Sequence, residues 1–305
     1  MKIVRILFVS IAVAVLALAA GIKFNPSSLV LLSRDVKARS PFCSAWKASL
    51  DGHIKLRQYA VAEQLAKVSH LVKREAGLML WSTPNGDYWV PNGDDNILPL
   101  LLAQEDRNIY GTGEWGVQSG DTVLDVGAYI GTWTRWALAH GAKQVIAIEP
   151  SPASVECLKR NLAAEVAAGK VIIYPKGIWD SEGSLTLFAN SQSGVGNSFV
   201  EHNDVADKIN SIPVTTIDKM SAELGLARVD FIKADVKGAT ERLMRGGSTV
   251  IRRDHPRIAV STEEPSDDAG AIAKLAVALL PTYRMQCGPC LLDGKEIYTD
   301  VLMFR

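Results

Sequence analysis

The sequence predicts an α/β protein whose sheet is mostly parallel and whose last strand is antiparallel. Three observations support this prediction. Short apolar strands alternate with helical patterns from residue 121 onward, the first strand ends in a glycine turn, and several strands end at an acidic residue. Alternation of this kind is typical of βαβ units, whose parallel strands are buried on both faces.

The glycine turn follows the apolar residues Val123, Leu124 and Val126. It contains Gly127, Ala128 and Gly131, and a helical pattern begins at Thr132. Glycine has no Cβ, so a ligand can approach such a turn closely. The segment therefore predicts the strand, turn and helix of a Rossmann-like nucleotide-binding unit.

The next strand, Gln144–Ile148, ends at Glu149 and Pro150. A carboxylate roughly 20 residues beyond the glycines is placed to accept hydrogen bonds from both hydroxyls of a ribose. The turn is not G-x-G-x-x-G, and Asp125 lies where a pyrophosphate would approach. Because a carboxylate repels phosphate, we expect S-adenosylmethionine, which carries a sulfonium and an ammonium group, instead of a dinucleotide.

Composition narrows the class of protein. The chain has 305 residues, of which 48% are hydrophobic, and its 33 Lys and Arg balance 33 Asp and Glu. A sizeable core is expected, and without a basic excess nucleic acid is not an expected partner. We predict an N-terminal hydrophobic segment at 1–24, a helical linker at 25–77 and a catalytic domain at 78–305.

The segment 1–24 has an apolar run from Ile6 to Ile22, close to the shortest length that spans a bilayer. Ala17-Leu18-Ala19 resembles a signal-peptide cleavage site, which leaves export with a cleaved signal open. A methyl donor made in the cytosol favours an uncleaved membrane anchor with a cytoplasmic catalytic domain.

Three elements are expected before the glycine turn. Apolar residues at helical spacing predict one or two helices between Ser44 and Ala76, and a Pro-Asn-Gly turn within 82–87 predicts a β-hairpin. A further helix is expected at 97–107, and the following Tyr110 either lies over the cofactor or belongs to a plain loop.

After Glu149 the pattern predicts a helix at 151–168 and a strand at 171–174. The next loop contains Trp179, which either stacks on adenine or fills the core. A strand is expected at 184–188. The polar segment 190–207 then has little periodicity and holds four candidates for substrate contact, of which His202 is a candidate general base: Asn197, Ser198, Glu201 and His202.

The strand Val229–Val236 carries Asp235 near its carboxyl end, and the strand Arg257–Ser261 leads to Glu263 and Glu264. Ligands of open α/β sheets bind at the carboxyl ends of the strands, so these acids should converge with Asp125 and Glu149 on one crevice. A helix at 269–280 and two closing strands, 283–286 and 298–304, complete the predicted sheet.

Four cysteines, Cys43, Cys157, Cys287 and Cys290, are too few for a disulfide scaffold. The run Cys287-Gly288-Pro289-Cys290 has the spacing of a thioredoxin-type redox motif. No Trp precedes it and no helical pattern follows it, so a turn that holds two thiols is the favoured interpretation. No metal site is predicted.

The residues resemble the FkbM family of S-adenosylmethionine-dependent methyltransferases from about Leu78 to the C-terminus. The resemblance rests on Asp125–Gly131, Glu149-Pro150, Val214–Asp218 and, most specifically, Asp230–Ala239. It implies that Gly127 and Gly131 shape the methionine end of the cofactor site, that Glu149 holds the ribose, and that Asp235 lies at the sulfonium and the acceptor. Lys237 and Thr240 depart from the acidic residues usual in the family.

The resemblance implies methyl transfer to a hydroxyl of a small molecule or glycan. Asp235 is the first candidate base, with Glu263, Glu264 and His202 as alternatives. Two other functions stay open at this point. One is a membrane-tethered pseudo-methyltransferase that serves as a binding module, which Lys237 keeps open, and the other is a nucleotide-dependent oxidoreductase.

Overall fold

The computed structural model describes residues 36–190, 197–200, 205–264 and 266–305. Within them, a seven-stranded sheet has the order β13-β16-β12-β11-β5-β6-β7. Its strands are β5 (Thr122–Val126), β6 (Gln144–Ile148), β7 (Val171–Tyr174), β11 (Phe231–Ala234), β12 (Arg257–Ser261), β13 (Met285–Cys287) and β16 (Val301–Phe304). Only β16 runs antiparallel to its neighbours in this sheet, which confirms the predicted sheet.

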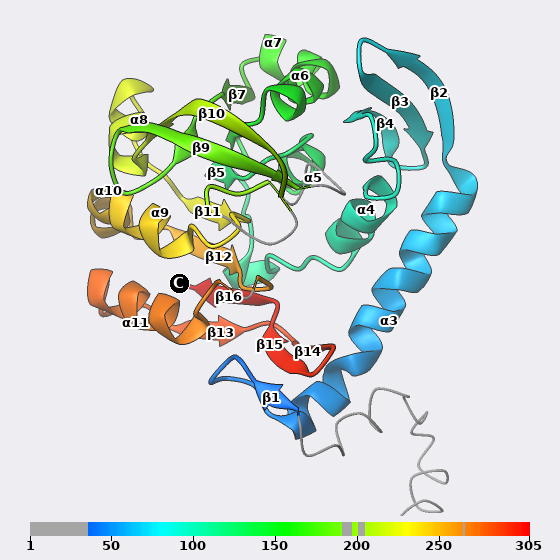
Figure 1. Cartoon of the computed structure of the whole chain (residues 1–305). Helices are drawn as coiled ribbons and strands as arrows, with labels where there is room; N and C mark the ends of the chain where they lie inside the picture. The colour runs from blue at the N-terminus through cyan, green and yellow to red at the C-terminus, as the bar shows by residue number, and fades with distance from the viewer. Residues whose placement is uncertain (1–35, 191–196, 201–204, 265) are drawn as a thin grey trace, which may run out of the picture.

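Helices connect the strands of this sheet (Figure 1). They are α5 (Thr132–Ala139), α6 (Pro152–Asn161), α7 (Ala163–Ala167), α8 (Ile217–Glu223), α9 (Thr240–Gly246), α10 (Ser248–Asp254) and α11 (Ala269–Leu279). The predicted single helix at 151–168 is interrupted at Leu162, whose side chain is fully buried. The apolar side chains of β5, β6 and β11 form the core that fixes the strand ends.

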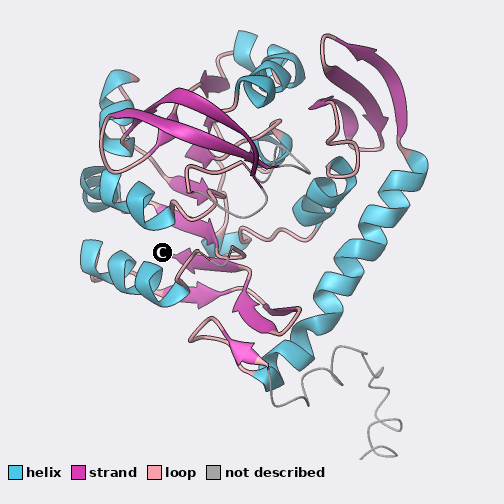
Figure 2. Cartoon of the chain, viewed as in Figure 1, coloured by secondary structure: helices cyan, strands magenta, loops and turns pink. Residues whose placement is uncertain are grey.

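A separate three-stranded sheet in the order β8-β10-β9 lies beside the central one (Figure 2). It consists of β8 (Gly177–Ile178), β9 (Gly183–Asn190) and β10 (Val205–Thr215). The predicted irregular segment 190–207 therefore begins and ends within strands. Ser198 also forms a backbone bridge with Phe188, which places residues 197–200 against this sheet. Glu201 and His202 lie outside the described residues.

The N-terminal part begins with α3 (Ala45–Val68), where the Ser44 hydroxyl accepts a hydrogen bond from the backbone N–H of Lys47 at 3.2 Å. The expected helix to Ala76 is wrong at its end, because β2 (His70–Glu75) pairs instead with β3 (Leu78–Thr83). The predicted hairpin of β3 and β4 (Gly86–Pro91) and the predicted helix α4 (Leu98–Asp106) are confirmed. A short 3-10 helix, η1 (Gly113–Trp115), follows.

The two ends of the described chain meet in a third small sheet, β1-β15-β14, formed by β1 (Lys37–Ala38), β15 (Glu296–Thr299) and β14 (Cys290–Asp293). A disulfide joins Cys43 to Cys290 across this region, with a Cα–Cα distance of 5.6 Å. The expected pair of thiols is therefore wrong for Cys290, while Cys287 is free. The partners are 247 residues apart in sequence, a separation that spacing alone does not reveal.

In the part of the chain that the structure describes, every helix is too short or too polar to cross a membrane. The predicted anchor or signal segment, residues 1–24, lies outside the described residues.

Candidate functional site

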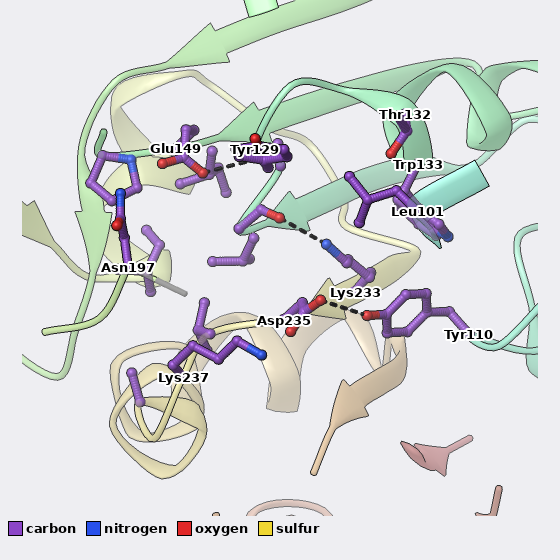
Figure 3. A pocket seen from close by; sticks show the side chains of 18 of the residues that line it. Leu101, Tyr110, Tyr129, Thr132, Trp133, Glu149, Asn197, Lys233, Asp235 and Lys237 are labelled. Atoms are coloured by element: carbon purple, nitrogen blue, oxygen red, sulfur yellow. Dashed lines mark hydrogen bonds between the residues drawn. The ribbon is translucent and has the colours of Figure 1, made fainter. Parts of the chain in front are cut away.

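A cavity opens at the carboxyl ends of β5, β6 and β11 (Figure 3), with about 1070 Å³ of empty space including its open mouth. Of the predicted site residues, seven line it: Gly127, Ala128, Glu149, Pro150, Asn197, Ser198 and Asp235. Tyr110 and Lys237, also named from the sequence, line it too. The predicted crevice at the strand ends therefore exists, and Tyr110 belongs to its wall.

Gly127 allows the turn after β5 to approach β11. Its φ is +79°, and a Cβ at this position would overlap with the backbone oxygen of Asp235. The backbone N–H groups of Gly127 and Ala128 both donate to the carbonyl of Ile148 at 3.0 Å, which ties the turn to β6. The turn thus needs glycine for the positive φ and for the close contact between strand ends.

Glu149 is held by backbone groups on both of its oxygens. Oε2 accepts from the N–H of Tyr129 and Oε1 from the N–H of Ser151, each at 2.9 Å. Burial raises the pKa of this carboxyl to about 7, although the two backbone donors act in the opposite direction. Each oxygen retains a lone pair, so a buried acceptor faces the cavity where a ribose was predicted.

Asp125 does not line the cavity, contrary to its predicted contact with the cofactor. Its side chain is fully buried, accepting a hydrogen bond from the Thr134 hydroxyl at 2.6 Å and one from the Lys233 ammonium at 2.9 Å. Lys233 Nζ also donates to the carbonyl of Gly127 at 2.9 Å (Figure 3). Asp125 therefore positions the glycine turn through Lys233. The pair is formed because the two residues are register partners on β5 and β11.

Asp235 follows the last residue of β11 and faces the cavity. Its Oδ2 accepts a hydrogen bond from the Tyr110 hydroxyl at 3.0 Å (Figure 3). Burial acts to raise its pKa, but the ammonium groups of Lys237 and Lys233 hold the pKa below its usual value. The carboxylate is thus ionised at neutral pH and shares the cavity with Glu149.

Three lysines line the cavity, and each has an acidic partner. The N–O distances are 3.5 Å for Lys176 to Glu223, 2.9 Å for Lys233 to Asp125 and 2.7 Å for Lys237 to Glu264. The carboxyl groups of Glu105, Glu149 and Asp235 line the same cavity. Burial raises the pKa of Glu105 to about 8 and that of Glu149 to about 7, so Asp235 is the fully ionised acid of the three at neutral pH. With the lysines paired, this negative charge suits a cationic ligand better than a phosphate.

Other predicted residues lie elsewhere. Gly131 begins α5, where a Cβ would come within 2.8 Å of Leu162, so its lack of a side chain serves helix packing. The Trp179 ring lies edge-on to Phe199 with centroids 6.2 Å apart. Phe199 lines the cavity but Trp179 does not, which favours the core role over adenine stacking.

The candidate bases after β12 also lie outside the lining of the cavity. Glu264 forms an ion pair with Lys237. Glu263 is half-buried, and burial raises its pKa although the charge of Lys237 acts to lower it. His202 lies outside the residues that the structure describes. Asp235 is the one predicted base that the described structure places in the cavity wall.

Two important residues of the site were not singled out from the sequence. The first is Lys233. A lysine inside the apolar strand Val229–Val236 was a usable signal of a buried ion pair. Glu105 gave no signal, because it lies between Gln104 and Asp106 on a helix with several polar residues. Its place in the cavity depends on how α4 packs against α5.

Residues 125–280, more than half of the chain, match the model of the Methyltransferase FkbM domain. The chain belongs to the FkbM methyltransferase family. Its cofactor is S-adenosylmethionine.

A 72-residue stretch is 39% identical to a "Probable ribosomal RNA small subunit methyltransferase A" of Methanosphaera stadtmanae, covering 24% of this chain and 22% of that relative. The crystal structure of Methyltransferase FkbM from Methylobacillus flagellatus KT is 15% identical, with a TM-score of 0.48, and the match covers 83% of this chain and 60% of that one. The crystal structure of a SAM-dependent methyltransferase from Agrobacterium tumefaciens is 11% identical, with a TM-score of 0.42, and the match covers 76% of this chain and 71% of that one. The chain thus spans about a fifth of the first relative and 60% of the FkbM structure.

The residues of the cavity fit this cofactor. Glu149 offers buried acceptors for ribose hydroxyls beside the apolar side chains of Pro150 and Ile178, which suit an adenine ring. Asp235 offers a negative charge for a sulfonium. The fit rests on the donors and acceptors present and on the paired lysines, which leave no free cation in the described wall for a phosphate.

Proposed function

We propose that this protein methylates a hydroxyl oxygen of a small molecule or glycan. The observation that supports this most directly is Asp235, an ionised carboxylate in the cavity wall that already accepts a hydrogen bond from Tyr110. A hydroxyl acceptor must lose its proton, and a carboxylate within hydrogen-bond reach is the group that assists this loss.

S-adenosylmethionine supplies a methyl group that is activated by a positively charged sulfur. The chain itself has to hold the cofactor and the acceptor in line and to take up the proton of the hydroxyl. Glu149 binds the ribose, and the turn at Gly127 sets the distance between β5 and β11. Tyr110 fixes the direction of the Asp235 carboxylate by its hydrogen bond to Oδ2.

Lys237 lies beside Asp235 and has an unusual charge for this family. Burial acts to lower its pKa, but Asp235 and Glu264 raise the pKa above the usual value, so its ammonium stays protonated. In the proposed reaction this cation stabilises negative charge that develops on the acceptor oxygen. Its pairing with Glu264 leaves the net charge of the wall unchanged.

Product analysis tests the proposal. Purified protein is incubated with methyl-labelled S-adenosylmethionine and fractions of a cell extract, and labelled products are identified by mass spectrometry. We expect the label on an oxygen of a small molecule or glycan. Label on nitrogen or carbon would contradict hydroxyl methylation, and label on RNA would contradict a small-molecule or glycan acceptor. The expectation that nucleic acid is not a partner stays a prediction.

Two alternatives are separated by binding and turnover. Calorimetric titration with S-adenosylmethionine and NAD distinguishes a methyltransferase from an oxidoreductase, since the acidic cavity should bind only the first. A pseudo-methyltransferase would bind the cofactor without releasing labelled product from any fraction.

The location of the domain stays a proposal. Disulfides persist in oxidising compartments, so the Cys43–Cys290 bond favours the exported alternative over the predicted cytoplasmic side of a membrane anchor. Alkylation of free thiols in freshly lysed cells, followed by mass spectrometry, tests this. Alkylated Cys43 and Cys290 would support a cytoplasmic domain, and an intact bond would support export.

A further inference from the structure

Glu105 is a half-buried acid in the cavity wall whose role neither the family nor the proposed reaction defines. It lies in the last turn of α4 and lines the cavity together with Thr132 and Lys233. The Thr132 hydroxyl is a hydrogen-bond partner of its carboxyl group. The second oxygen, Oε2, is buried and has no hydrogen-bond partner among the described residues.

A buried carboxyl oxygen without a hydrogen-bond partner costs about 1–3 kcal/mol. The position of Glu105 adds to this cost, because the negative end of a helix dipole disfavours a carboxylate in the last turn. That turn of α4 has no basic residue to compensate. A cation entering the cavity would satisfy Oε2 and remove both penalties.

Lys233, a nearby cation of the chain, makes no hydrogen bond to Glu105 Oε2 in the described structure. Lys233 Nζ donates to Asp125 and to the carbonyl of Gly127, both at 2.9 Å. The cofactor carries two positive groups, the sulfonium and the α-ammonium. Asp235 lies at the end of β11, whereas Glu105 lies beside Thr132, where the turn after β5 passes into α5.

We propose that Glu105 binds the α-ammonium group of the methionyl part of S-adenosylmethionine, with Oε2 as the acceptor. Glu105 reaches the cavity from α4, and its partner Thr132 begins α5 directly after the glycine turn. The proposal rests on the identity of the cofactor and not on which acceptor is methylated.

Binding isotherms of three ligands test this assignment. The ligands are S-adenosylmethionine, S-adenosylhomocysteine and an S-adenosylhomocysteine analogue whose amino group is replaced by hydrogen. Glu105→Gln keeps the shape and removes the charge, so we expect the first two ligands to bind roughly 10-fold or more weakly. The deaminated analogue should bind the variant and the wild type equally.

Asp106→Asn is the matched control, because Asp106 is the next residue on α4 and is exposed. It should leave all three affinities unchanged. A loss for S-adenosylmethionine alone would assign Glu105 to the sulfonium and overturn the proposal. An equal loss for all three ligands, or no loss, would also overturn it, as expected if Glu105 is structural or binds only water. If the wild type binds none of the three, the cofactor assignment itself fails.

Proton release gives a second readout that a structural role would not produce. Burial raises the pKa of Glu105 to about 8, with Thr132 and Lys233 lowering it and Asp125 raising it. From β4 the phenol of Tyr88 also faces this carboxyl. A bound ammonium should lower the pKa, so S-adenosylhomocysteine binding near pH 7.5 releases a proton.

The release is measured from binding enthalpies in phosphate and in Tris, which differ in ionisation enthalpy. Glu149 has a pKa of about 7 and can release protons in both the wild type and the variant. The relevant quantity is therefore the difference in proton release between the wild type and Glu105→Gln. We expect the wild type to release more protons than the variant. Equal release would contradict the proposal.

Discussion

The ends of β5 and β11 carry an aspartate each, and the structure uses the two in opposite ways. Asp125 lies within β5 and is fully buried in a bond with Lys233. Asp235 lies one residue beyond β11 and faces the cavity. A displacement of two residues along neighbouring strands thus separates a carboxylate that is paired inside the protein from one that faces the cavity.

The sheet register explains this difference. Asp125 and Lys233 are directly paired across the two parallel strands, and side chains at paired positions point to the same face of a sheet. The lysine therefore neutralises Asp125 inside the protein. Asp235 lies one residue beyond the last paired residue of β11, and its side chain accepts a hydrogen bond from Tyr110 at the cavity.

The largest effect is expected from Lys233→Met, which leaves Asp125 charged and buried. Breaking a buried ion pair by removing one partner costs about 3–5 kcal/mol of unfolding free energy. Urea denaturation followed by circular dichroism measures this loss. The control is Lys143→Met at an exposed position, which should stay within about 0.5 kcal/mol of wild type. Equal midpoints for both variants would show that the pair contributes nothing.

Asp235→Asn should lower turnover about 100-fold, because the variant keeps the shape of the carboxylate but no longer accepts a proton. The urea midpoint should fall less than in Lys233→Met, because Asn at this position can still accept the hydrogen bond from Tyr110. Labelled-methyl release with the identified acceptor measures the rate. Turnover close to wild type would make Asp235 as structural as Asp125.

Gly127→Ala tests the close approach of the two strand ends. We expect a loss of about 1–3 kcal/mol from the positive φ, plus a further loss from the overlap with the Asp235 oxygen. Gly225→Ala is the control, because Gly225 has a φ of +61° and no atom within 4 Å of the added Cβ. Thermal unfolding compares the two. Equal losses would mean that the contact between β5 and β11 is easily relaxed.

The last prediction concerns Glu149, at the end of β6 beside β5. Its folded-state pKa is raised to about 7 from 4.5, so the folded protein binds more protons than the unfolded one between these values. The stabilisation is full below about pH 4.5 and is lost as the pH rises through 7. The cofactor-free wild type should therefore lose more stability between pH 5 and 8 than Glu149→Gln. Parallel curves of urea midpoint against pH would contradict this.

The sequence by itself determined the central sheet and the general place of the site. Apolar runs predicted β6 and β12 with their observed bounds, since strands buried on both faces need such runs. The acid after β6, Glu149, and the acid after β11, Asp235, were correctly placed at the cavity, because the ends of parallel strands meet at one edge.

Only the tertiary structure decided which acids face the ligand and which are neutralised. The pairing of Asp125 with Lys233 depends on register, and the arrival of Glu105 at the cavity depends on the packing of α4 against α5. The bond between Cys43 and Cys290 likewise depends on the chain ends coming together. These contacts join residues far apart in sequence, so local patterns do not identify the two partners. A side chain's charge is visible in a sequence, but its electrostatic role is set by the groups that surround it once the chain is folded.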